Sequence, residues 1–279
     1  MAQIGAFNQL EVLDIIAHGA VLDGQDKGEI LLPNRYVPNN CEAGDVLDVF
    51  VYADSQDRLV ATTQKPKAQS GDFASLKVVQ VNKIGAFLDW GLPKDLLVPF
   101  NHQQRPMEVG KHYVVRVIVD ERTERIVAST KLDRYLDVWP AEYKNGQEVD
   151  LIIATKTDLG FKAIINNQHW GLIFQSDIFK PLRTGQKLKG YVKQMRPDGR
   201  VDLTLSRPGK GKVIDFQDQL IDYLNKNDGF CNIHDKSSPA LIQKTFGVSK
   251  KAFKATVGHL LKQGKITIEP NGIRLSNTK

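Results

Sequence analysis

The chain has few of the residues that build metal centres, disulfide frameworks or nucleophilic sites. Only two cysteines occur in 279 residues, Cys41 and Cys231, and they lie in distant segments. The six histidines are scattered, and none has a cysteine or carboxylate at the spacing of a metal site. We therefore expect no disulfide, no metal and no cofactor.

Long apolar runs and phosphate-binding loops are also missing. No segment approaches the roughly 18 apolar residues that cross a membrane, and the first residues, MAQIGAFNQL, lack the features of a secretory signal. Neither a Walker-type glycine loop nor a dinucleotide-binding fingerprint occurs. These absences predict a cytoplasmic protein with no membrane partner and no catalytic residues. A nuclease is the enzyme class that they leave open.

Acidic residues are concentrated at the start of the chain and are outnumbered by basic residues later. Residues 1–66 carry 4 Lys and Arg against 10 Asp and Glu, whereas residues 141–279 carry 23 against 13. Basic regions attract the phosphates of nucleic acids and release counterions. The asymmetry has two interpretations, a nucleic-acid-binding C-terminal half or a solvated basic surface.

Three segments repeat one pattern of short apolar strands. The first contains LEVLDIIAHGAVLDG (residues 10–24), and the second contains LKVVQVNKIGAFLDW (residues 76–90). Each continues with a short strand that ends in proline, then a glycine and a long alternating hairpin. The third, from VDLIIATKTDLGFKAII (residues 149–165) onward, keeps the plan more loosely and turns at PDG. Five short strands in about 65 residues predict a closed barrel for each repeat.

The period of the apolar residues becomes helical after residue 213. Phe216, Leu220 and Leu224 indicate a first amphipathic helix. Ser238 is the expected N-cap of a second helix, which begins at Pro239 and stops at Gly247.

Ser249 is the expected N-cap of a third helix, which Gly264 ends. Its apolar stripe consists of Phe253, Val257, Leu260 and Leu261. A hairpin around EPNG follows, and three helices with a hairpin predict a winged helix.

The expected fold is mainly β with a small α+β C-terminal domain. We assign barrels to residues 1–66, 67–140 and 141–208, and the winged helix to residues 213–279. The stretch RPGKGK (residues 207–212) is interpreted as a basic linker.

At these motifs the sequence resembles a known family. GAFLD (residues 85–89), GLIFQSDI (residues 171–178) and the glycine-led hairpins resemble S1 RNA-binding domains, which are five-stranded barrels of the oligonucleotide-binding (OB) fold. The stretch HDKSSPALIQKTFGVSKKAFKATVGHLLKQGKITIEPNGIRL (residues 234–275) resembles the conserved virulence factor B family of bacteria. The resemblance implies three tandem S1 domains, a winged helix and RNA-binding regulation of gene expression.

Two phenylalanines are candidates for stacking on RNA bases. In GAFLDW, alternation separates Phe87 from Ala86, Leu88 and Trp90. Phe87 is then exposed for stacking or covers a barrel end, and Trp90 belongs to the core or a domain contact. The resemblance places Phe174 where S1 domains contact RNA, with core packing as the alternative.

The first repeat departs from this pattern. Val21 stands where the second repeat has Phe87, and the segment is acidic. We expect weak RNA binding or none there, and a role in packing or protein binding instead. In the third repeat, the strand GFKAII (residues 160–165) places either Lys162 or Phe161 on the RNA-binding face, depending on its register.

Basic residues of the last two barrels are candidates for RNA contact, with a solvated surface as the alternative. Arg116 lies in an alternating strand that should not bury an unpaired charge. The full set of candidates is Lys83, Arg116, Lys193, Arg196 and Arg200.

In the winged helix, Lys250, Lys251 and Lys254 fall in the first turns of the third helix, where helix-turn-helix proteins present groove-reading residues. No Arg, Asn or Gln accompanies them, which favours phosphate contact over base reading. Protein interaction and a solvated face are the alternatives.

These observations lead to three hypotheses. The first is a non-enzymatic single-stranded RNA-binding protein that regulates gene expression post-transcriptionally, by stacking on barrels two and three and by phosphate contacts from the basic half. The second is a DNA-binding transcriptional regulator that uses the winged helix on duplex nucleic acid. The third is a protein-binding adaptor for the ribosome or transcription machinery.

Overall fold

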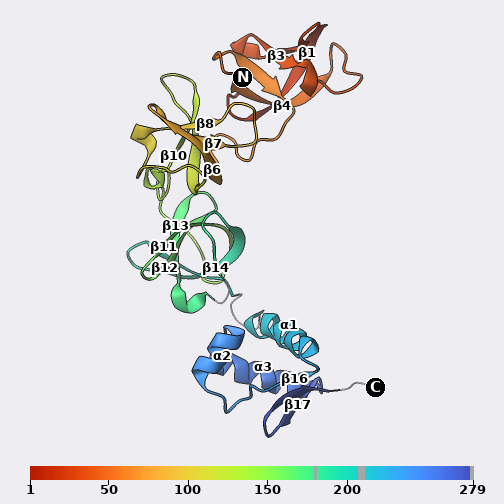
Figure 1. Cartoon of the computed structure of the whole chain (residues 1–279), viewed down its shortest axis with the longest axis vertical. Coiled ribbons are helices and arrows are strands. Elements are labelled where there is room, and N and C mark those ends of the chain that lie inside the picture. Colours follow the sequence, from red (N-terminus) through yellow and green to blue (C-terminus); the bar gives the residue numbers. More distant parts are fainter. Residues whose placement is uncertain (179–180, 207–210, 277–279) are drawn as a thin grey trace. The chain divides into compact units, whose positions relative to one another are not determined.

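The chain folds into two compact units, Met1–Val138 and Trp139–Lys279. The computed structural model describes residues 1–178, 181–206 and 211–276. The first unit holds two closed barrels, and the second holds a third barrel and a helical domain (Figure 1). The expected basic linker falls largely on residues 207–210, which lie outside the described residues.

Each barrel is a closed sheet of five strands. The first barrel consists of β1 (Phe7–Ile16), β2 (Gly19–Asp23), β3 (Glu29–Pro33), β4 (Val46–Ala53) and β5 (Leu59–Thr62). The second consists of β6 (Phe73–Asn82), β7 (Gly85–Asp89), β8 (Leu96–Pro99), β9 (His112–Val119) and β10 (Ile126–Ser129). The third consists of β11 (Glu148–Thr157), β12 (Gly160–Ile165), β13 (His169–Phe174), β14 (Lys187–Met195) and β15 (Val201–Thr204).

The three barrels share one topology. Neighbouring strands follow the order first, second, third, fifth, fourth, and the sheet closes between the fourth and the first. All pairs are antiparallel except the third with the fifth, which run parallel. This is the arrangement of OB-fold barrels, and the mainly β fold expected from the sequence is confirmed.

The same two local features bend each sheet into a barrel. The first strand has a register shift in the same place each time, at Val12/Asp14, Val78/Gln80 and Ile153/Thr155. The second strand begins at a glycine with positive φ, of 153° at Gly19, 155° at Gly85 and 150° at Gly160. A Cβ on these glycines would lie 2.0 to 2.3 Å from a carbonyl oxygen of the third strand, so only glycine fits. Bulges and glycines are the usual means of curving a small barrel.

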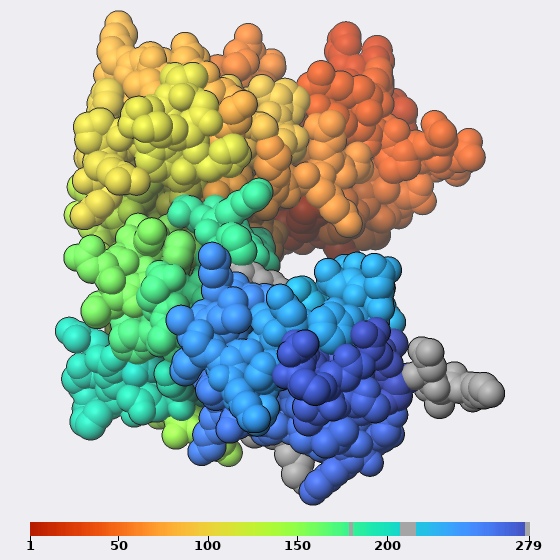
Figure 2. Space-filling view, turned by 60° about the horizontal axis from the view of Figure 1, so that its bottom comes forward, coloured from red at the N-terminus to blue at the C-terminus, as the bar shows by residue number. Residues whose placement is uncertain are grey.

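The first two barrels share a hydrophobic core. Along β4, Val49 and Val51 pack inside the first barrel, whereas Phe50 and Tyr52 pack with residues of the second. The Phe50 and Trp90 ring centroids lie 5.7 Å apart at 77°. The surfaces of these barrels, coloured red to yellow, meet in the space-filling view (Figure 2). Of the two roles left open for the first repeat, packing on a neighbour is the one that the structure shows. The expectation that Trp90 belongs to the core or a domain contact is confirmed, because it is buried in the shared core against Phe50.

The helical domain is a winged helix with its own core. Its elements are α1 (Gly211–Lys226), β16 (Phe230–Cys231), α2 (Pro239–Phe246), α3 (Lys250–Lys262), β17 (Ile266–Glu269) and β18 (Gly272–Leu275). The Ser238 side chain accepts a hydrogen bond from the Leu241 amide, and that of Ser249 accepts one from the Ala252 amide, so both expected N-caps are present. Gly247 has the left-handed conformation that ends α2.

Two details of this domain differ from the sequence-based expectation. Leu261 was placed in the apolar stripe of α3, but it is 43% exposed because Phe253, Val257 and Leu260 already fill the core side of the helix. The sheet also has a third strand, β16, which pairs with β18. A strand of two residues is too short to show an alternation of apolar and polar residues in the sequence.

Among the described residues, no helix combines the length and apolar character needed to cross a membrane.

Candidate nucleic-acid interface

The outer surface of the third barrel carries the main candidate site. Along β12 and β13, Ala163 and Ile173 lie in the barrel core, and alternation leaves Lys162, Trp170 and Phe174 on the outside. Strand β14, which β15 separates from β13, and the turn after it add two cations. We call this surface the third-barrel face; it consists of Lys162, Trp170, Phe174, Lys193 and Arg196.

Phe174 is half-buried at the end of β13, and two cationic groups lie near its ring. The Lys193 Nζ lies 5.9 Å from the ring centroid, and the Arg196 Cζ lies 5.5 Å from it. Both distances fall within the range of a cation–π contact. The pairing of β13 with β15, and of β15 with β14, thus brings together three residues that the sequence analysis selected separately.

Each of these cations is held by a buried carboxylate. The Lys193 Nζ donates to Asp177 at 2.8 Å, and the Arg196 Nε donates to Asp202 at 3.0 Å. The Asp177 and Asp202 side chains are 11% and 6% exposed, whereas those of Lys193 and Arg196 are 47% and 29% exposed. The hydrogen bond to Asp202 raises the pKa of the Arg196 guanidinium, so the group stays charged. The sequence analysis identified both cations but neither carboxylate.

Trp170 belongs to the same face and was missed from the sequence. The Lys162 Nζ lies 3.8 Å from the centroid of the Trp170 ring. The signal was present, because Trp170 and Phe174 are four residues apart on one strand and therefore share a side. Of the alternatives left open for β12, the structure selects Lys162, because Phe161 packs against the barrel core and is not on the face.

Arg200 lies at the edge of this region. It is exposed in the hairpin between β14 and β15, and its Nε lies 3.6 Å from Asp198. It makes no ring contact with Phe174 among the described residues.

In the second barrel, Phe87 faces outward as alternation predicts. Ala86 and Leu88 lie in the core, and Phe87 lines a hollow of about 390 Å³. Tyr52 and Asp57 of the first barrel also line this hollow. The first barrel therefore narrows the space in front of Phe87.

The charges beside Phe87 differ from those beside Phe174. Asp57 pairs with both Lys94 and Arg125, so one carboxylate binds both cations that line the hollow. Asp95 has no ion-pair partner among the described residues, and burial together with Asp89 raises the pKa of its carboxyl group. Lys83 is exposed in the turn between β6 and β7. No described cation lies over the Phe87 ring.

Arg116 requires a correction. It is predicted as an RNA contact on a strand that should not bury an unpaired charge, but it is half-buried on β9 with its guanidinium 4.7 Å from the Phe73 ring centroid. Its Nε is buried without a hydrogen-bond partner among the described residues. Burial lowers the pKa of this group, and Asp72 partly offsets that effect. Arg116 is thus partly buried against an aromatic ring and has no ion-pair partner among the described residues.

The winged helix presents two of its three candidate lysines to solvent. Lys251 and Lys254 are exposed on the first turns of α3, and neither has an ion-pair partner among the described residues. The Lys250 Nζ instead donates to the carbonyl oxygen of Ser237 at 2.9 Å. Lys250 therefore fixes the loop before α2 and is less available to a ligand.

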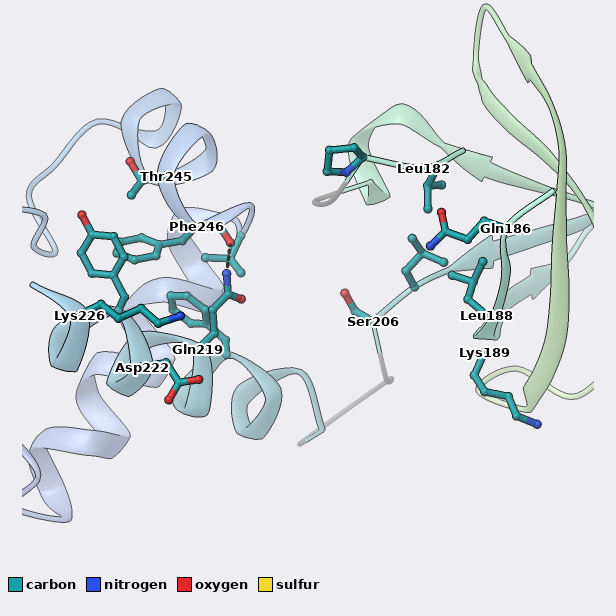
Figure 3. A pocket seen from close by; sticks show the side chains of 15 residues that line it. Leu182, Gln186, Leu188, Lys189, Ser206, Gln219, Asp222, Lys226, Thr245 and Phe246 are labelled. Atoms are coloured by element: carbon teal, nitrogen blue, oxygen red, sulfur yellow. Dashed lines mark hydrogen bonds between the residues drawn. The ribbon is translucent and has the colours of Figure 1, made fainter. Parts of the chain in front are cut away.

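A further hollow in the second unit is lined by aromatic rings that pack on one another. On its winged-helix side, Gln219 donates to the carbonyl oxygen of Phe246 at 3.5 Å, near Asp222 and Lys226 of α1 (Figure 3). Phe216 and Phe246, which also line it, are buried against each other with centroids 5.5 Å apart. Among the described residues, no three His, Cys, Asp or Glu side chains are grouped as a metal site would need.

Comparison with known proteins identifies the types of domain. A model of the S1 domain matches residues 4–64, and a model of the CvfB-like winged helix domain matches residues 218–275. OB-fold barrels of the S1 type and winged helices are nucleic-acid-binding modules. The domain content therefore indicates nucleic-acid binding or regulation.

The chain is similar to whole proteins from several bacteria. The uncharacterized protein YitL of Bacillus subtilis is 30% identical over 260 residues, which cover 88% of this chain and 84% of that protein. Conserved virulence factor B of Staphylococcus epidermidis is 23% identical over 98% of this chain and 95% of its own length. A crystal structure of a multidomain protein with nucleic acid binding domains from Streptococcus pneumoniae is 26% identical, covers 98% of both chains and has a TM-score of 0.45.

The similarity thus extends from the first barrel to the wing, and it includes a winged helix described by the family's own model. This chain belongs to the conserved virulence factor B family.

Proposed function

We propose that the protein is a non-enzymatic, single-stranded RNA-binding protein that regulates gene expression post-transcriptionally. The observation that carries the proposal is the Phe174 ring on the outer side of the third barrel, with Lys193 and Arg196 beside it. Barrels of this fold bind single strands by stacking bases on aromatic side chains, while cations follow the backbone.

The two cation-rich regions supply different contacts. On the third-barrel face, the charges of Lys193 and Arg196 are balanced by carboxylates, so this face contributes stacking and hydrogen bonds. On the winged helix, Lys251 and Lys254 have no acidic partner among the described residues, so they supply the contacts with phosphates. Phe87 adds a second, weaker stacking position.

The test is fluorescence anisotropy of the full chain with a labelled 12-nucleotide single strand of RNA and a duplex DNA of the same sequence. We expect binding of the RNA that weakens steeply with salt. Phe174→Leu, which keeps an apolar side chain but removes the ring, should weaken binding, whereas Phe174→Tyr should not.

Other results would favour the alternatives. Tighter binding of duplex DNA would indicate a transcriptional regulator that uses the winged helix. No binding of any nucleic acid at low salt would indicate a protein-binding adaptor. RNA that is shortened after incubation with the protein and Mg²⁺ would contradict the non-enzymatic part of the proposal.

A further inference from the structure

We infer that Phe174, Arg196 and Lys193 form a base-reading subsite that selects guanine. The inference rests on the proposed function, because it assigns a base preference to the stacking position on the third-barrel face. It adds that the cations of this face read the edge of a base.

The hydrogen bonds within the site leave donors available to a ligand. Arg196 uses its Nε on Asp202, and no described residue accepts a hydrogen bond from its Nη1 or Nη2. Lys193 uses one of its three N–H groups on Asp177. A base that stacks on Phe174 therefore has a two-pronged donor edge and an ammonium group at its side.

The carboxylates fix these donors before a ligand binds. Asp202 lies on β15 and also accepts a hydrogen bond from the Gln194 amide at 3.0 Å. Asp177 is buried at the end of the short turn Gln175–Asp177, which follows Phe174, the last residue of β13. Side chains held in place lose less conformational entropy on binding, which favours specific recognition.

The arrangement of donors matches one base better than the others. Guanine presents two adjacent acceptors, O6 and N7, to which a guanidinium binds in a bidentate manner. Adenine and cytosine place an amino donor on the corresponding edge, which would face the donors of Arg196 and Lys193. Uracil has carbonyl acceptors but no adjacent pair. The amide of Gln194 already donates to Asp202, so it does not offer its donor for a bidentate pair with adenine.

The experiment compares single bases in one host strand. The probe is a labelled 12-nucleotide oligoadenosine whose central base is adenine, guanine, inosine or 7-deazaguanine, bound to the full chain and followed by anisotropy. We expect guanine to bind about tenfold more tightly than adenine, the scale of one bidentate pair. Inosine, which keeps O6 and N7, should retain the gain, and 7-deazaguanine, which lacks N7, should lose most of it.

Protein variants test which residue reads the base. Arg196→Lys keeps the charge but removes the planar fork, so the strands with a central guanine and a central adenine should bind this variant with equal affinity. Arg200→Lys is the matched control in the same hairpin and should keep the preference. Thermal unfolding of both variants checks that the third barrel is intact.

The outcomes separate the two proposals. Equal affinities for guanine and adenine, or a preference that survives 7-deazaguanine or Arg196→Lys, would overturn the guanine subsite and leave RNA binding standing. An absence of binding to every probe would overturn the proposed function and the subsite with it.

Discussion

The second and third barrels have the same strand order, the same bulge and the same glycine, but their outer faces differ. Phe87 faces a hollow that the first barrel narrows, and no cation lies over its ring among the described residues. Phe174 has Lys193 and Arg196 beside it, each seated on a buried carboxylate. One topology therefore supports two faces of different chemistry.

The difference arises from residues that do not affect the fold. Inward positions of both barrels hold aliphatic side chains, which the closed sheet requires. Outward positions are free to change, and in the first barrel they have lost the aromatic ring at Val21. That barrel instead uses the outer side of β4 to pack on its neighbour. The binding potential of a barrel is thus set by its outward residues and by what covers them.

The largest expected effect concerns this packing. Phe50→Ala removes a fully buried ring at the contact between the first two barrels and should destabilise residues 1–138 by about 3–5 kcal/mol. Residues 139–279 should unfold as before, since Phe50 lies in the other unit. Hydrogen exchange measured by mass spectrometry distinguishes the two units.

The matched control is Phe100→Ala, because Phe100 is 53% exposed in the second barrel. Its cost should stay below about 1 kcal/mol. If both variants destabilise residues 1–138 equally, the shared core does not hold the first two barrels together. The first barrel would then not be fixed in front of Phe87.

The second prediction compares the two rings directly. Phe174→Ala should weaken RNA binding by about 1–3 kcal/mol, the scale of one stacked base. Phe87→Ala should cost less, because residues of the first barrel also line its hollow and the hollow contains Asp95, which has no ion-pair partner among the described residues. Anisotropy titrations of the single and double variants give both values, and an unchanged affinity in the double variant would rule out stacking on either barrel.

Much of this architecture could be predicted from the sequence. Alternation correctly placed Ala86 and Leu88 inside the second barrel and Phe87 outside. Ser238 and Gly247 correctly marked the two ends of α2. These are local signals, in which neighbouring residues determine the conformation. The family resemblance added the order of the domains.

The remainder depended on contacts between distant segments. The sequence does not show that Arg196 lies near Phe174. Their proximity depends on β15, which pairs with β13 on one side and with β14 on the other. Nothing in the sequence distinguishes Asp202 from the other residues of its alternating strand, although its side chain is buried and paired with Arg196. The rule that a strand does not bury an unpaired charge did not predict the place of Arg116, which is half-buried beside the rings of Phe73 and Tyr135.

The third prediction concerns paired and unpaired cations. The double variant Lys251→Ala/Lys254→Ala should reduce the slope of log affinity against log salt by about 0.7 for each lysine that contacts a phosphate of a single strand. Lys111→Ala is the control, because Lys111 is exposed but paired with Glu108 at 2.7 Å in the second barrel. Titrations at several salt concentrations measure the slope, and equal slopes in all three proteins would show that α3 does not contact RNA.

The smallest effect concerns two carboxylates of the second barrel whose pKa values shift in opposite directions. Burial raises the pKa of Asp95, so the folded state binds its proton more tightly than the unfolded state. The resulting cost to stability begins as pH rises through the unfolded pKa, about 4, and is fully present above the raised pKa. Asp95→Asn should therefore stabilise residues 1–138 by a few tenths of a kcal/mol at pH 7 and have no effect in acid.

Asp89 is the matched control for this variant. The hydrogen bond from Lys67 lowers the pKa of Asp89, so its contribution to stability is present at pH 7 and is lost as pH falls through the lowered pKa. Asp89→Asn should thus destabilise the same unit at pH 7, by an amount that salt reduces because both side chains are exposed. Urea unfolding at pH 7 and in acid gives the sign of each effect. If both variants shift stability in the same direction at pH 7, Asp95 is not the destabilising carboxylate of the second barrel. The contrast drawn between the charges near Phe87 and those near Phe174 would then fail.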